Sequence, residues 1–124
     1  MANPDIKSPS SIRYANAQVS LTSTSATQLI SNAANSGKVL LIDTITVANV
    51  DGVNACDVSV VRFQSATNTG TAYPIGSTIA VPADATLIVV GRENPISLTE
   101  GQSVYVTASA ANDLVVDVNW KEVT

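Results

Sequence analysis

The C-terminal stretch from Thr99 to Glu122 constrains the fold more than any other part of the chain. Its apolar residues recur at every second position in two runs, Val104, Val106 and Ala108, and then Leu114, Val116, Val118 and Trp120. Successive side chains of a β-strand point to opposite faces of a sheet, so each run has one face to bury. Residues 110–113, Ala-Ala-Asn-Asp, tolerate turn geometry. The stretch therefore predicts an antiparallel hairpin.

The length and composition predict a single domain with an aliphatic core. A chain of 124 residues can bury roughly two-thirds of the surface that it exposes when unfolded. Hydrophobic residues make up 45% of it and charged residues 13%, which is too apolar for a disordered chain. Because the chain has only one Trp, one Phe and three Tyr, we expect Val, Ile, Leu and Ala to build the core.

Charge and cysteine content exclude several classes of partner. The net charge is −4 and the six Lys and Arg residues are scattered, so we expect no binding to nucleic acid, which needs clustered cations. No apolar stretch approaches the length of a membrane span, so no membrane partner is predicted. The single cysteine excludes an intrachain disulfide, and the N-terminal residues lack the features of a signal peptide. We expect synthesis and assembly in a cytoplasm.

Turn residues divide the chain into short strands. Residues 1–11 contain two prolines and three serines and predict an extended N-terminal arm. Residues 12–124 predict one all-β domain, an antiparallel β-sandwich of about eight strands with jelly-roll or Greek-key connectivity. Besides the two C-terminal runs, strands are expected at 12–22, 38–49, 56–65, 72–81 (two short pieces about Gly76), 86–90 and 96–98.

Local patterns add expectations about single strands. In the first strand Ile12, Tyr14, Val19 and Leu21 are the candidates for the inward face. The first two are out of phase with the last two, so we expect a bulge or bend near residues 16–18. The run at 38–49 is apolar on both faces at its start and alternates at its end. The wholly apolar run at 86–90 predicts a strand that is covered on both faces.

Two connections are less regular. Residues 23–34 have apolar spacing that would suit a short helix, but their Ser, Thr and Asn content favours a loop or a strand. The Asp51-Gly52 pair between two apolar runs predicts a hairpin turn that joins the strand at 38–49 to the one at 56–65.

Candidate catalytic and metal-binding residues do not combine into a predicted site. The chain has no histidine, which removes the commonest general base and the commonest metal ligand. Asp51, Asn54 and Asp57 could offer oxygen ligands to calcium, but Asp and Asn are also the usual turn residues and the spacing is not that of an EF-hand. We therefore predict no enzyme activity, no cofactor and no metal site.

Three other side chains are notable. Trp120 is in phase with the apolar residues of its run, which favours the core over a sugar-stacking platform. Tyr105 alternates with Val104 and Val106, so we expect it to be exposed and to anchor an interface. Cys56 has no basic neighbour in sequence and predicts an inert, partly buried thiol.

Three segments, taken in order along the chain, resemble the small all-β virion proteins of tailed bacteriophages. They are G-K-V-L-L-I-D-T-I-T-V-A-N-V-D-G at 37–52, I-A-V-P-A-D-A-T-L-I-V-V at 79–90, and the stretch at 95–122 that begins P-I-S-L-T-E-G-Q. In that family a strand ending in Asn, a V-P-A turn, an L-x-E-G-x turn and a final hydrophobic hairpin follow one another in this order.

The resemblance implies a structural role in a virion, assembled in the host cytoplasm. The chain would be a capsid decoration (cement) protein that binds the major capsid protein or other virion subunits, or else a neck, tail or fibre component. By the same analogy it would be a homo-oligomer, with a trimer favoured. We expect the partner contacts at Ile6, Pro9 and Ile12 of the arm, at Thr67, Asn68 and Thr69 of a polar loop, and at Tyr105.

Other functional classes remain as alternatives. A tail or fibre module that binds host glycans needs exposed aromatic side chains, for which Tyr73 and Tyr105 are the candidates. An adhesin or pilus module would suit the Ser, Thr and Asn content but would need export. A small hydrolase is disfavoured by the lack of histidine.

Overall fold

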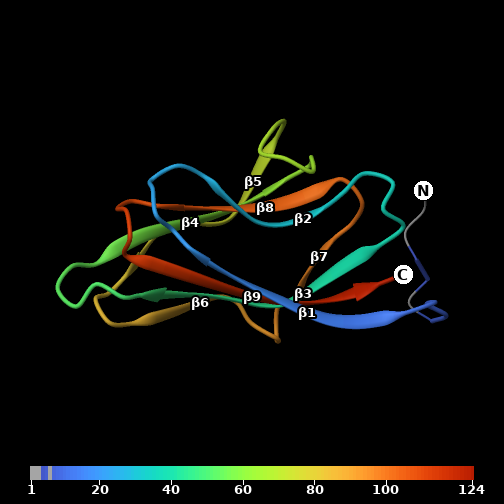
Figure 1. Cartoon of the computed structure of the whole chain (residues 1–124), viewed down its shortest axis with the longest axis horizontal. Helices are drawn as coiled ribbons and strands as arrows, with labels where there is room; N and C mark the ends of the chain where they lie inside the picture. The colour runs from blue at the N-terminus through green and yellow to red at the C-terminus, as the bar shows by residue number, and fades with distance from the viewer. Residues whose placement is uncertain (1–3, 6) are drawn as a thin grey trace.

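The computed structural model describes residues 4, 5 and 7–124, and within these residues the chain forms nine β-strands and no helix (Figure 1). All the strand pairs are antiparallel. In this described part of the chain there is accordingly no helix that could cross a membrane. The strands are β1 (Ile12–Ser20), β2 (Thr27–Asn32), β3 (Val39–Asn49), β4 (Cys56–Phe63), β5 (Ala72–Val81), β6 (Thr86–Val90), β7 (Ile96–Leu98), β8 (Gln102–Ala108) and β9 (Leu114–Val123).

The strands of the described residues belong to two sheets, which Figure 1 shows as two layers. The β9 sheet has the order β1-β9-β3-β6, with β7 also paired to β3, and the β8 sheet has the order β2-β8-β4-β5. Buried side chains from both sheets form one hydrophobic cluster, for example Ile45 and Val116 from the β9 sheet and Val60 and Val104 from the β8 sheet. The prediction of an all-β fold with an aliphatic core is confirmed.

The two C-terminal strands do not pair with each other, so the predicted hairpin is wrong. β8 lies between β2 and β4, whereas β9 lies between β1 and β3 in the other sheet. The turn itself is present, with Asn112 at a φ of 65°. The hairpin expected at Asp51-Gly52 is wrong for the same reason, because β3 and β4 also lie in different sheets. Crossing to the facing layer lets the apolar faces of consecutive strands meet across the core.

β1 keeps one continuous register with β9, from Ile12 opposite Val123 to Ser20 opposite Val115. The bulge expected near residues 16–18 is therefore absent from this strand. Ala17 and Val19 pack against the core, while Ile12 and Tyr14 point away from it and are 52% and 79% exposed. Ile12 and Tyr14 can stay outside because β1 is an edge strand.

One bulge of the β9 sheet lies in β3, at Asp43. The register between β3 and β9 shifts between Ile42 and Thr44. Ile42 and Ile45 are both fully buried although they are three residues apart. The extra residue thus returns the apolar side chains of β3 to the core after Ile42.

β2 and β6 settle two further expectations. Residues 27–32 form a strand rather than a helix, as the polar content of this segment favoured. β6 does not have two covered faces, since Ile88 is 67% exposed, so that prediction is wrong. In the described residues β6 pairs only with β3, at the border of the β9 sheet. The register between these two strands shifts at Val89, so that Val89 and Val90 both contact the core while Ile88 points away from it.

Two buried asparagines connect the sheets at opposite ends of β3. Asn32 in β2 donates its side-chain N–H groups to the carbonyls of Lys38 and Leu98, at 2.9 and 3.0 Å. Asn49 at the end of β3 donates to the carbonyls of Asn54 and Val81, at 3.0 and 2.9 Å. Leu98 belongs to β7 and Val81 to β5, so each amide joins one layer to the other.

We expect Asn49→Ala to lower the free energy of unfolding by about 2–4 kcal/mol, because it removes a set of buried hydrogen bonds. Besides its two donated bonds, Asn49 accepts a bond from the N–H of Asp51 at 2.9 Å. Equilibrium urea unfolding measures the change. Asn119→Ala is the control, since Asn119 is exposed and donates one bond, to Thr44, so its loss should stay below about 0.5 kcal/mol. Equal losses for the two variants would contradict the role of Asn49.

Candidate functional site

The residues predicted to lie in the N-terminal contact region are only partly described. Ile6 lies outside the described residues. Pro9 is half-buried and Ile12 is exposed. Between them, the N–H groups of Ser10 and Ser11 both donate to the carbonyl of Thr124, so the segment is attached to the end of the chain just beyond β9. Residues 10 and 11 thus extend the β1–β9 ladder.

The predicted polar loop connects β4 to β5 and is fixed at its base. Thr67, Asn68 and Thr69 are exposed, as expected. The hydroxyl of Ser103 donates to the carbonyl of Ser65 at 2.7 Å, and that of Ser31 donates to Ala66 at the same distance. These bonds hold the start of the loop against β8 and β2, so its exposed tip starts from a fixed point on the β8 sheet.

Tyr105 is not the exposed anchor that its alternation predicts. It is only 9% exposed, and its hydroxyl donates to Oε1 of Gln28 at 3.0 Å. The ring of Phe63 packs edge-on against it, with ring centroids 5.5 Å apart. The alternation correctly places Tyr105 on the face opposite Val104. On that face Phe63 of β4 and Gln28 of β2, the two neighbouring strands, contact and cover Tyr105.

The other two notable side chains lie in the interior, and Cys56 is buried more deeply than predicted. Trp120 is partly buried and packs against the hydrophobic core, as predicted. Cys56 is buried, and its sulfur lies 3.4 Å from the hydroxyl of Ser109. Both side chains therefore contribute to packing in the interior.

The most distinctive outward-facing group surrounds Tyr14, and we call it the Tyr14 surface. It lines a depression of about 310 Å³ formed by Tyr14, Asp43, Arg92, Pro95 and Lys121. Lys121 lies opposite Tyr14 in the β1–β9 register, with Nζ 5.9 Å from the ring centroid. The same ammonium is 3.7 Å from Oδ1 of Asp43. An exposed aromatic ring is thus bordered by two cations and one carboxylate.

The Tyr14 surface depends on the bulge in β3. Asp43 is the extra residue there, and bulges commonly re-aim a side chain. A second depression of about 200 Å³ adjoins it and shares Asp43, Pro95 and Lys121, adding the apolar side chains of Leu41 and Ile96. The sequence prediction missed this group because its members come from four separate segments. If Ala15, Ala17 and Val19 are taken as the inward-facing residues of β1, alternation places the side chain of Tyr14 on the outer face.

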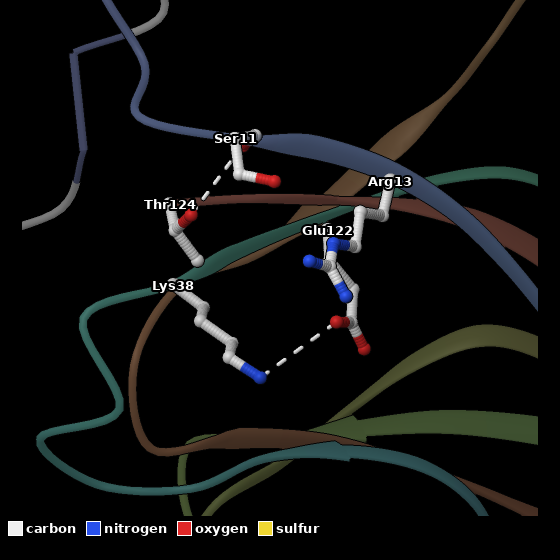
Figure 2. A pocket seen from close by; sticks show the side chains of 5 residues that line it. All are labelled: Ser11, Arg13, Lys38, Glu122 and Thr124. Atoms are coloured by element: carbon white, nitrogen blue, oxygen red, sulfur yellow. Dashed lines mark hydrogen bonds and ion pairs between the residues drawn. The ribbon is translucent and has the colours of Figure 1, made fainter.

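A further pocket lies where β1, β3 and β9 meet near the chain end, and Figure 2 shows its five lining side chains. Its volume is about 240 Å³, and its lining is Ser11, Arg13, Lys38, Glu122 and Thr124. Nζ of Lys38 is 3.7 Å from Oε2 of Glu122, and Nε1 of Trp120 donates to Oε1 of the same carboxylate at 3.5 Å. The arrangement neutralises Glu122 and joins β3 to β9.

Asp51, one of the three residues considered for calcium, is used inside its own turn. Hydrogen bonds from the backbone N–H groups of Val53 and then Asn54 lower the pKa of the Asp51 carboxyl below its ordinary range. The Val53 bond is 2.9 Å long. Asp57 instead lies in β4, where its N–H donates to the hydroxyl of Ser109. Among the residues that the structure describes, no group of three or more acidic or cysteine side chains is placed to hold a metal ion.

The comparisons with known proteins do not assign the chain to a family. No protein-family model matches the sequence, and no curated protein matches it either. The function is therefore inferred from the residues and surfaces of this chain.

We expect the stability contributed by Asp51 to depend on pH in the acidic range. Because its pKa is lower in the folded chain than in the unfolded chain, the contribution is present above the unfolded value of about 3.9 and is lost as the pH falls through the folded value. Asp51→Asn should therefore be less stable than the native chain at pH 7, and the difference should vanish at low pH.

Urea unfolding between neutral and strongly acidic pH measures this difference. Glu93→Gln removes one exposed carboxylate from the turn before β7 and controls for the change in net charge. A difference for Asp51→Asn that stays constant down to the lowest pH would contradict the assigned role of the carboxylate.

Proposed function

We propose that this protein is a structural component of a tailed-bacteriophage virion, and that within the virion it is a decoration protein that binds and stabilises the assembled shell. Its partners would be the major capsid protein, other virion subunits and further copies of itself. The protein would be made in the host cytoplasm and would reside on the virion. A neck, tail or fibre position is the alternative place in the particle.

The observation that carries this proposal is the strand order, which fits a jelly-roll β-sandwich. A jelly roll has eight strands in two sheets, arranged as two Greek keys, and it is common in viral capsid and lectin domains. The orders β1-β9-β3-β6 and β2-β8-β4-β5 correspond to that arrangement, with β7 added beside β3. A shared fold alone does not define a function, so the sequence resemblance is needed as well.

The segments that resemble virion proteins contribute both central strands of the β9 sheet, β9 and β3, and one of the two central strands of the β8 sheet, β8. Residues 37–52 contain β3, residues 79–90 contain the end of β5 and all of β6, and residues 95–122 contain β7, β8 and most of β9. β3 and β9 pair along ten positions, from Val39 opposite Val123 to Asn49 opposite Leu114. The resemblance therefore concerns the strands that organise the fold.

Cementing would work by many modest contacts. A specific protein interface buries roughly 1,600 Å² in total, and repeated contacts on one shell reinforce one another. The N-terminal segment with Pro9 and Ile12 and the loop tip at residues 67–69 are the contact regions that we propose. The first would work as an arm that orders on a neighbouring subunit, while the sandwich stays rigid.

The Tyr14 surface favours a second candidate function, the binding of host glycans. Its ring is 79% exposed and is bordered by Asp43, Arg92 and Lys121, which can donate and accept hydrogen bonds. An aromatic face beside a few polar groups is a suitable platform for a sugar ring. This function would suit a tail or fibre position better than a shell position.

We expect deletion of residues 1–9 to abolish binding to purified shells and to leave the fold intact. The deletion keeps Ser10 and Ser11, whose N–H groups bond to Thr124. Binding is measured by co-sedimentation with shells that lack the protein, and folding by the NMR spectrum of the free variant. A second variant, with Asn68→Ala and Thr69→Ala, tests the loop tip separately. Full occupancy by the deletion variant would contradict the arm contact, and a native chain that never binds shells would contradict the decoration function.

Glycan binding predicts a specific effect at Tyr14. If the native chain binds a host glycan on an array, Tyr14→Ala should weaken that binding by roughly fivefold, since an aromatic contact is worth on the order of 1 kcal/mol. Tyr73→Ala is the control, because Tyr73 is 54% exposed but lies in β5 of the other sheet. Equal effects of the two substitutions, or no glycan bound by the native chain, would contradict this candidate.

A further inference from the structure

The free edge of β1 presents a regular row of backbone hydrogen-bonding groups. Ser11 and Thr124 exchange both of their N–H to carbonyl bonds, and at the other end of the same register the N–H of Leu21 donates to Leu114. Hydrogen-bonded and non-hydrogen-bonded pairs alternate in an antiparallel ladder, so the odd-numbered residues of β1 bond to β9. The even-numbered residues therefore turn their N–H and carbonyl groups to the free edge. They are Ile12, Tyr14, Asn16, Gln18 and Ser20.

These five residues also carry exposed side chains, because backbone direction and side-chain direction alternate with the same period. Among the backbone hydrogen bonds of the described residues, none links their N–H or carbonyl groups to another strand or loop. β1 thus offers nine residues of straight, unpaired edge, which is a template for another strand.

The other edges of the described sheets are interrupted. β5 contains Pro74 and a positive φ at Thr78, and its register with β4 shifts twice. β2 shifts its register between Gln28 and Ile30. β6 and β7 are only five and three residues long. Natural sheets use such interruptions to prevent edge pairing, and β1 has neither a proline nor a bulge.

We propose that the β1 edge pairs with the β1 edge of a second copy of this chain, giving a twofold dimer with one continuous sheet. With Asn16 on the twofold axis, Tyr14 lies opposite Gln18 of the second copy and Ile12 lies opposite its Ser20. All five outward-facing residues are then paired, and roughly ten hydrogen bonds form, two for each pair. No other register on this edge pairs all five.

The side chains of the edge are compatible with self-pairing. The five outward residues are uncharged, so like charges do not meet at the new junction. In the next strand, Lys121 lies beside Tyr14 and Asp117 lies beside Gln18. The two rows through Tyr14 and Gln18 would therefore run from a lysine of one copy to an aspartate of the other, and the remaining rows would end in uncharged residues. A second copy is selected as the occupant because its identical edge pairs all five outward residues and brings no like charges together.

The dimer is independent of the proposed virion function and differs from the trimer that the phage resemblance implies. A C2 interface uses the same patch on both subunits, whereas a ring of three needs two different patches. A single strand pair is a small interface, so we expect a dimer that dissociates on dilution and that forms readily when copies are concentrated on a particle.

Two measurements on the full chain test the pairing. Analytical ultracentrifugation from micromolar to millimolar concentration should show a monomer converting to a dimer. Amide hydrogen exchange followed by NMR should show that residues 12, 14, 16, 18 and 20 become protected as the dimer forms, while Ala15, Ala17 and Val19 are protected at every concentration. A monomer throughout, a trimer, or a dimer with unprotected even-numbered amides would each overturn the proposal.

Substitutions at Asn16 test the register. Asn16→Lys and Asn16→Glu each place like charges opposite one another on the axis, so each should weaken the dimer several-fold, and mixing the two variants should restore it. Asn16→Pro removes an outward N–H without touching a bond to β9 and should abolish the dimer, whereas Asn16→Ala should retain it. Unchanged dimers in the Lys, Glu and Pro variants would overturn the assignment. A chain that stays monomeric in solution, and whose even-numbered amides become protected only when it binds shells, would overturn self-pairing. The proposed virion function would not be contradicted by that result.

Discussion

The packing of the two apolar sheet faces against each other is the interaction on which the rest of the structure depends. In the described residues every connection except β4–β5 and β6–β7 carries the chain from one sheet to the other, so consecutive strands bury their apolar faces against a shared core. The crossings bring backbone carbonyls into the interior at both ends of β3. Asn32 and Asn49 supply the donors that these carbonyls need, because an unpaired buried carbonyl would oppose the packing.

Local sequence predicts where the strands are but not which strands pair. Alternation predicts β8 and β9, and the turn residues predict the connection at Asn112. The same turn residues, however, are found both in a hairpin and in a connection that crosses from one sheet to the other. The exposure of a side chain cannot be predicted from alternation where it depends on which strands lie beside its own strand. Tyr105 is buried because β8 is central, and Ile88 is exposed because β6 is at a border. Ile12 and Tyr14 are large and suggest an inward face, whereas the smaller Ala17 and Val19 are the side chains of β1 that pack against the core.

The surfaces available for function follow from this architecture. The bulge at Asp43 restores the apolar phase of β3 and also brings a carboxylate toward Lys121, beside the exposed ring of Tyr14. Residues 10 and 11 bond to Thr124 at the end of the chain, so the N-terminal segment leaves the two-sheet fold from a fixed point. The straight edge of β1 presents backbone groups in a regular row. A two-layered body with an attached segment and one straight, unpaired edge among the described strands is the form on which our proposal of a multi-copy virion protein rests.

If the protein belongs to a tailed phage, as we propose, its copy number in purified virions tests the decoration role most directly. Quantitative mass spectrometry gives its ratio to the major capsid protein in particles freed of unbound protein. A decoration role predicts a fixed, near-stoichiometric ratio that is the same in every preparation. A handful of copies per virion would contradict the decoration role and leave a neck, tail or fibre position, and complete absence from the virion would contradict the structural role as a whole.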